Sequence, residues 1–177
     1  MDLTKIILPD SIIVSGSVYK IHTGHPYWFR FYQLIQQKDM LLSGFDFIYI
    51  DRKPEDRKTG LEKLLNFYYE KKELPRVDES QSCERVLDYD IDSDLIYAAI
   101  MQCYHVDLYE KEMHWHKVRA LINGLYGTKL NEIISYRICD PKKDKNLEKM
   151  KRLWKLPEIQ NEDDKEALDN FNKIFYK

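Results

Sequence analysis

The sequence has few cysteines, and it lacks both a long hydrophobic run and a basic, apolar N-terminal leader. Only three cysteines occur in 177 residues, at Cys83, Cys103 and Cys139, with wide spacing and no C-x-x-C arrangement. This pattern argues against a disulfide scaffold and a four-cysteine zinc site, so we expect reduced thiols, with Cys103 and Cys139 buried. No segment approaches the roughly 18 apolar residues that cross a bilayer, which predicts a protein of the cytoplasm without a membrane partner.

The chain also lacks an excess of charge of either sign. It carries 28 basic and 30 acidic side chains, a formal net charge of −2. A nearly neutral chain has no overall field that attracts nucleic acid or an anionic membrane, so such binding would need a local patch. At 177 residues, 44% of them hydrophobic, the chain is long enough to bury one core, and we expect a single domain over residues 1–156.

The N-terminal part predicts a small antiparallel sheet and then a buried helix. Ser11–Val14 and Val18–Ile21 are β-branched or aromatic runs, and Ser15–Ser17 between them contains a glycine suited to a turn. After His25-Pro26, apolar residues recur at helical spacing. Phe45–Ile50 begins with strand-like alternation and is expected to add a third strand, although six residues do not separate a strand from a helix by their period.

Helical patterns dominate the rest of the sequence. Residues 61–69 form an amphipathic stripe, and residues 76–90 are polar without a period, as in a mobile connection. Three short helices follow, with Ser93 and Thr128 as N-caps of the first and third and with residues 114–125 as the second. The expected fold class is α+β, predominantly α: a small N-terminal antiparallel hairpin or sheet packed on a bundle of short helices.

The last part of the sequence separates by charge. Residues 142–155 hold seven basic and two acidic side chains, whereas residues 158–169 hold six acidic side chains and one lysine. We interpret residues 157–177 as an acidic linker followed by a short amphipathic helix, whose apolar edge includes Phe171 and Phe175. That edge needs a surface, either on this domain or on a partner.

Five separated motifs of the second half occur at Asp88–Ala99, Tyr104–Leu108, Met113–Trp115, Ala120–Leu125 and Ile133–Arg137. Together they resemble the bacteriophage gene-product-fifteen family, whose pattern includes D-x-x-x-I-Y-A, Y-x-I-D-L, L-H-W-W-K and I-x-x-Y-R. The likeness covers most of residues 6–156. It identifies the family-motif residues as Tyr97, Asp107, His114, Trp115, Tyr136 and Arg137. The sequence departs from the pattern at Met113 and His116, which replace a leucine and the second tryptophan.

The resemblance implies a role in building the phage tail. Members of the family look like tail-morphogenesis proteins encoded beside the tape-measure gene, and such proteins are thought to coat the long tape-measure protein before the tail tube polymerises. The expected protein is therefore a tail-assembly chaperone of the bacterial host cytoplasm that is absent from the mature virion. Its expected partner is the tape-measure protein, with other tail proteins and a homo-oligomer left open. No catalytic residue, cofactor or metal comes with the resemblance, and we expect no enzyme.

The residues that suit metal chemistry favour structural roles. His114 and His116 are two residues apart, about 200° around a helix, so one regular helix does not bring both to one metal. A hydrogen-bonded His114 beside Trp115 at a helix start is the favoured interpretation. Residues 88–94 alternate with aspartate but lack the glycine and the bidentate glutamate of a calcium loop, so they favour a helix start in which the carboxylates complement the helix dipole.

Two alternatives to the chaperone hypothesis remain open. Lysine and arginine in residues 142–155, with Trp154 among them, suit phosphate contact and base stacking, as in an accessory nucleic-acid-binding protein. The adjacent acidic run and the net charge of −2 disfavour nucleic acid. A structural phage component is the other alternative. As partner-binding residues we expect Trp154, Phe171 and Phe175, because exposed aromatic side chains suit contacts with the apolar helices of another protein.

Overall fold

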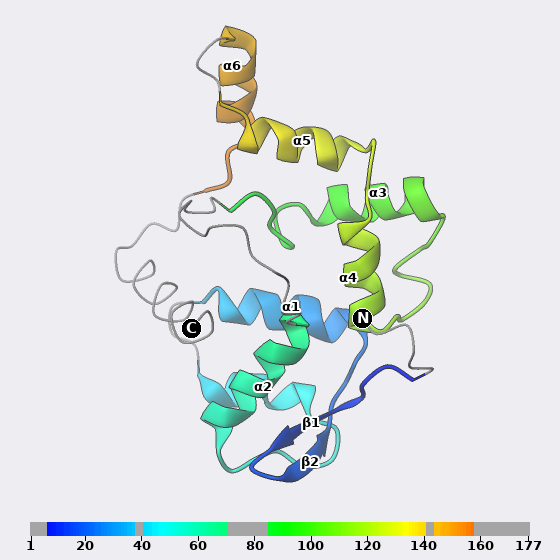
Figure 1. The fold of residues 1–177 in the computed structure, drawn as a ribbon, viewed down its shortest axis with the longest axis vertical. Helices are drawn as coiled ribbons and strands as arrows, with labels where there is room; N and C mark the ends of the chain where they lie inside the picture. The colour runs from blue at the N-terminus through cyan, green and yellow to red at the C-terminus, as the bar shows by residue number, and fades with distance from the viewer. Residues whose placement is uncertain (1–6, 38–40, 71–84, 141–143, 158–177) are drawn as a thin grey trace, which may run out of the picture. The chain divides into compact units, whose positions relative to one another are not determined.

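The computed structural model of the protein describes residues 7–37, 41–70, 85–140 and 144–157 (Figure 1). The chain folds as two compact units. Unit 1 comprises Met1–Cys83 and Leu87–Glu132, and unit 2 comprises Glu84–Val86 and Ile133–Lys177. The described residues are mainly helical with one two-stranded antiparallel sheet, which confirms the expected fold class. The single domain expected over residues 1–156 stays a prediction.

The sheet of unit 1 is a hairpin of β1 (Ser11–Val14) and β2 (Ser17–Lys20), as expected. Its turn is one residue shorter than predicted, because Val14 pairs with Ser17 and only Ser15 and Gly16 lie between the strands. Both turn residues have positive φ, 50° and 79°, which matches the twist that a two-residue hairpin turn requires. The hairpin packs on helix α2 (Arg57–Tyr69), whereas we expected it to pack on the later helices.

Helix α1 (His25–Ile35) follows the hairpin and confirms the predicted buried helix. Pro26 occupies its first turn, where the missing N–H removes no helical hydrogen bond. Trp28 and Phe31 are completely buried, and the indole Nε1 of Trp28 donates to the His22 carbonyl at 2.9 Å. The aromatic side chains of α1 therefore form the centre of the unit 1 core.

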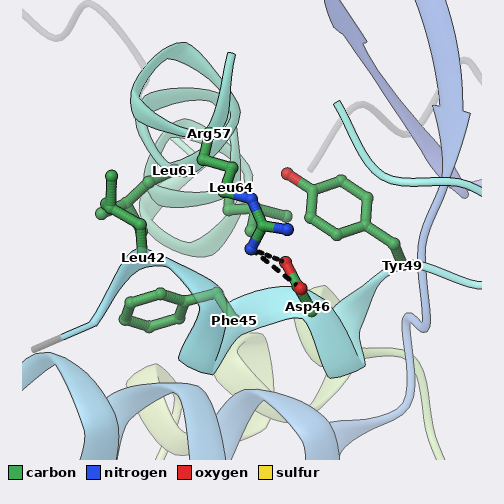
Figure 2. A pocket seen from close by; sticks show the side chains of 7 residues that line it. All are labelled: Leu42, Phe45, Asp46, Tyr49, Arg57, Leu61 and Leu64. Carbon is green, nitrogen blue, oxygen red and sulfur yellow. Dashed lines mark hydrogen bonds and ion pairs between the residues drawn. The ribbon is translucent and has the colours of Figure 1, made fainter. Parts of the chain in front are cut away.

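The predicted third strand is wrong, because a 3-10 helix, η1 (Leu42–Ile48), occupies most of that segment. Phe45 and Ile48 both face the core, and residues three apart align along a 3-10 helix. The buried apolar residues in the segment that suggested a strand are thus spaced three residues apart, as Phe45 and Ile48 show. On the outer side, Asp46 accepts a hydrogen bond from Arg57 of α2 at 2.8 Å (Figure 2). The cavity beside this pair measures about 10 Å³, which leaves room for a single water at most.

Helices α3 (Ser93–Tyr104), α4 (Trp115–Asn123) and α5 (Lys129–Ile138) confirm the three predicted helices. Thr128 caps α5 as predicted, since its hydroxyl accepts from the Asn131 amide at 3.3 Å and the Asn131 side chain accepts from the Thr128 amide at 3.2 Å. The expected cap at Ser93 is wrong by one position. Asp92 precedes α3, and its carboxylate accepts from the backbone amide of Asp88 instead of from the helix.

In unit 2, helix α6 (Lys145–Trp154) forms most of the basic segment, and Asp144 caps its start by accepting from the Asn146 amide at 2.8 Å. Arg137 is buried and donates from Nε to the Trp154 carbonyl at 2.8 Å and from Nη1 to the Val86 carbonyl at 2.9 Å. Charge-assisted hydrogen bonds of this kind join α5, which carries Arg137, to the end of α6 and to Val86. In the part of the chain that the structure describes, no helix has both the length and the apolar character needed to cross a membrane.

Candidate binding groove

Unit 1 contains a groove of about 600 Å³ between α1, α3 and the loop that leads from α3 to α4. Helix α4 contacts both α1 and α3 (Figure 1). The residues that line the groove are His25, Pro26, Phe29, Gln33, Tyr89, Asp90, Ser93, Ile96, Tyr97, Leu108, Tyr109 and Glu112. The volume falls within the usual range of about 300–1,000 Å³ for ligand sites. The groove is thus the candidate functional site.

The apolar wall of the groove rests on the rigid core. Phe29 of α1 meets the buried Trp115 ring edge-to-face at 5.5 Å, and Tyr89 meets the same ring at 5.9 Å. Phe29 and Tyr89 also contact each other at 5.7 Å. Edge-to-face aromatic pairs stabilise one arrangement of the rings beyond simple burial. The Trp115 ring therefore lies beneath the groove and holds the rings of Phe29 and Tyr89 in place.

Asp88 holds Tyr89 and Asp90 in position at one end of the groove. Its buried carboxylate accepts from the amides of Asp90 and Ile91 at 2.8 and 2.9 Å and from the hydroxyl of Tyr32 at 2.9 Å. These bonds make a tight turn before α3, as expected for a helix start. The expectation of a mobile connection through residues 76–90 is therefore wrong for its last residues, and residues 76–84 lie outside the described part.

Two family-motif residues, Tyr97 and Asp107, fix the loop that forms the opposite wall. The Tyr97 hydroxyl donates to Asp107 Oδ2 at 3.1 Å, and the Tyr109 amide donates to Asp107 Oδ1 at 2.8 Å. The rings of Tyr97 and Tyr109 lie 5.4 Å apart. Asp107 thus connects α3 to the loop residue whose exposed ring borders the groove.

His25 fastens the same loop to the start of α1. Its Nδ1 accepts from the Met113 amide at 3.1 Å, and its Nε2 lies 3.1 Å from the Leu108 carbonyl, so we assign the neutral tautomer with the proton on Nε2. Burial lowers the pKa of His25, and the backbone hydrogen bonds oppose this effect only in part. The imidazole therefore serves as an uncharged clamp.

Removing the Asp107 carboxylate is expected to loosen the loop without unfolding unit 1. In Asp107→Ala the Tyr109 amide loses its charged acceptor, so its hydrogen exchange should quicken roughly ten-fold or more. Exchange measured by NMR checks this result, and Asp107→Asn, which retains an acceptor oxygen, is the matched control. An unchanged exchange rate at Tyr109 in Asp107→Ala would contradict the assigned role.

The other motif residues of unit 1 do not line the groove: Trp115 is buried in the core, and His114 is half-buried beside it. His114 stands at the start of α4 and accepts from the His116 amide at 3.1 Å, which confirms the structural interpretation of His114. The side chains of Trp115 and His116 hydrogen-bond the carbonyls of Tyr68 and Phe67 at 2.9 and 2.8 Å. These carbonyls lie in the last turn of α2, where the Phe67 carbonyl also accepts from the Glu70 amide at 3.3 Å and the Tyr68 carbonyl also accepts from Arg119 Nη1 at 3.2 Å. Among the described residues no group of His, Cys, Asp and Glu is placed to hold a metal ion.

Of the expected partner-binding residues, the described part of the chain includes Trp154 alone. Trp154 is half-buried at the end of α6, and its Nε1 has no hydrogen-bond partner among the described residues. Phe171 and Phe175 lie outside the described residues. In unit 2, Tyr136 is half-buried beside Arg137, so this motif belongs to the internal packing of the unit. The expected contact residues therefore stay a prediction.

The expectation of buried cysteines is wrong. Cys103 and Cys139 are both half-exposed and free. Their Sγ atoms lie 3.5 Å from the Tyr126 carbonyl and 3.0 Å from the Tyr136 carbonyl, respectively. Cys103 lies at the edge of the α3 apolar face, where the loop after α4 covers it only in part. Cys83 lies outside the described residues.

Sequence reasoning missed the groove residues Phe29, Tyr89, Leu108 and Glu112. One signal was present, because His25, Phe29 and Gln33 are four residues apart and therefore share one face of α1. The pattern does not reveal that this face is only partly covered, because that depends on a loop some eighty residues later in the chain.

Comparison with known families gives one match. The family model described as Bacteriophage Gp15 protein matches residues 7–161, which include every residue of the groove. No curated protein and no solved structure matches the chain at a significant level.

Proposed function

We propose a function for this protein from the finding that it belongs to the bacteriophage Gp15 protein family, and is therefore a bacteriophage protein. It acts in tail morphogenesis as a non-enzymatic chaperone that binds the tape-measure protein. The groove of unit 1 receives apolar helical segments of this client and shields them from aggregation. The chaperone works in the host cytoplasm and leaves before the virion matures.

The groove is the observation that supports this proposal. Its middle is apolar, with Phe29, Ile96 and Leu108 among its lining residues, and Tyr109 stands 89% exposed at its edge. Tyrosine side chains of this kind contribute strongly to protein interfaces because they offer a large contact area with few rotatable bonds. The wall is also preformed by the Asp107 and His25 hydrogen bonds, which lowers the entropy cost of binding.

The hydrogen bonds in the groove favour binding over catalysis. His25 is the imidazole of the groove, and both of its ring nitrogens face main-chain partners. A general base needs a free lone pair within reach of the proton that it removes. Asp107 is likewise occupied by Tyr97 and the Tyr109 amide.

A second candidate function follows from α6. This helix carries Lys145, Lys149, Lys151 and Arg152, and Leu153 beside them is 67% exposed. An accessory nucleic-acid-binding role would make affinity fall steeply with salt through these residues. The remaining alternative is a structural phage component. Mass spectrometry of mature phage particles distinguishes it from a chaperone, because a structural component is present in the particles and a chaperone is absent from them.

Co-expression with fragments of the tape-measure protein of the same phage tests the proposal. A fragment that is insoluble alone should co-elute with this protein in size-exclusion chromatography with light scattering. Tyr109→Ala should weaken the complex about ten-fold or more, whereas Tyr126→Ala, also in unit 1 and 78% exposed but outside the groove, should leave it unchanged. Separate elution with every fragment would contradict the proposed function.

A further inference from the structure

Two carboxylates border the groove and have no cationic partner among the residues that the structure describes. Asp90 and Glu112 both line it and are both exposed. Neither forms an ion pair with any residue that the structure describes, and no lysine or arginine is among the lining residues. Since His25 is neutral, the groove carries net negative charge around an apolar middle.

The two carboxylates lie toward opposite ends of the α1 wall. Asp90 accepts from the side-chain amide of Gln33 at 2.9 Å, in the last part of α1. The carboxylate of Glu112 lies against Gly24, just before the first turn of α1. Gly24 and Gln33 are nine residues apart in the sequence, which is about 13 Å along the helix at 1.5 Å per residue. Phe29 lies between the two ends.

We propose that the groove recognises a basic amphipathic helix, with one lysine or arginine near Asp90 and another near Glu112. On an α-helical ligand, positions seven apart return to nearly the same face and lie about 10.5 Å apart along the axis, and the long side chains of lysine or arginine span the remaining few ångströms. Apolar residues three or four positions after the first basic residue then meet Phe29 and Ile96. This inference rests on the proposed function and specifies which client segments bind.

The chain itself argues against one competing occupant. Residues 158–169 hold six acidic side chains and one lysine, so they would place like charges beside Asp90 and Glu112. Like charges juxtaposed at an interface disfavour binding. The charge pattern therefore selects a basic segment of a partner over this acidic segment.

A fluorescent helical peptide tests the inference by anisotropy. The probe is alanine-rich, with two lysines about seven residues apart and two leucines midway between them. It should bind the full-length protein, and a probe with glutamates in place of the lysines should not. The double variant Asp90→Asn/Glu112→Gln should weaken binding about five- to ten-fold, because two partly exposed ion pairs are lost.

The matched control removes two other acidic charges close by. Asp94→Asn/Glu110→Gln changes the net charge by the same amount at exposed residues that do not line the groove. Equal weakening in both double variants, or no binding of the lysine probe, would overturn the inference. If a tape-measure fragment still co-elutes in that case, the proposed function survives without it. If the lysine probe binds but no tape-measure fragment co-elutes, the groove recognises basic helices and the proposed tape-measure partner is wrong.

Discussion

Trp115→Ala is expected to destabilise unit 1 by about 3–5 kcal/mol, the largest effect of any single substitution in the groove's support. Trp115 is fully buried, its ring stacks on Tyr68 at 5.0 Å, and its indole nitrogen donates to the Tyr68 carbonyl. Truncation leaves a large cavity and removes one of the two hydrogen bonds that the Tyr68 carbonyl accepts, the other being from Arg119 at 3.2 Å. Phe29 and Tyr89 also lose their support, so client binding should fall with stability.

Urea unfolding followed by far-ultraviolet circular dichroism measures this effect. Trp115→Phe, which retains an aromatic ring and loses the indole N–H, should cost less than Trp115→Ala. Tyr126→Ala should shift the free energy of unfolding by no more than about 0.5 kcal/mol, since its side chain is exposed. A loss below about 1 kcal/mol in Trp115→Ala would show that the ring does not support the unit.

Stability is expected to fall as the pH drops from about 6.5 to about 4, with a contribution of about 3 kcal/mol from His116. Burial lowers the pKa of His116 to about 4, helped by the nearby charges of His114 and Arg119. Below pH 6.5 the unfolded chain protonates this histidine while the folded protein does not, so acid favours unfolding. The contribution is fully present above pH 6.5 and is lost by pH 4.

The geometry of His116 explains why the folded protein resists its protonation. The imidazole is buried, Nε2 bonds the Phe67 carbonyl at 2.8 Å, and Nδ1 has no hydrogen-bond partner among the described residues. A proton on Nδ1 would therefore bury a charge without a counter-charge. The lowered pKa of His25 adds to the effect, and its protonation would also break the bond from the Met113 amide.

The free energy of unfolding measured at several pH values tests this expectation. Between pH 4.5 and 6, His116→Gln should reduce the slope by about 1 kcal/mol per pH unit, because glutamine does not titrate. The control His105→Asn alters an exposed residue with φ of 53°, which asparagine tolerates, and should leave the slope unchanged. Equal slopes for wild type and His116→Gln would refute the prediction.

The helices were predictable where apolar residues recur at helical spacing next to a capping residue. Trp28 and Phe31 mark α1, and Thr128 marks the start of α5, because such signals act within a few residues. Phe45 and Ile48 were misread as part of a strand, since two apolar positions in six residues fit a 3-10 helix equally well. Short apolar segments thus need their tertiary contacts to settle their structure.

The groove was only partly predictable, because it depends on contacts between distant segments. Tyr97 and Asp107 were identified through their motifs, but the motifs gave no indication that they fix a loop beside α1. The clamp from His25 to Leu108 joins residues 83 positions apart, which no local pattern reveals. Another of the family motifs, which contains His114 and Trp115, stabilises the start of α4 and its contact with the end of α2. A family motif therefore identified important residues without separating binding from packing.

Hydrogen exchange of the protein alone and in complex with a co-eluting tape-measure fragment tests the central claim most directly. The account predicts slower exchange in residues 89–97 and 105–113, which hold most of the groove residues outside α1, and no change in residues 145–154 of α6. Protection confined to residues 145–154, with none around the groove, would contradict it.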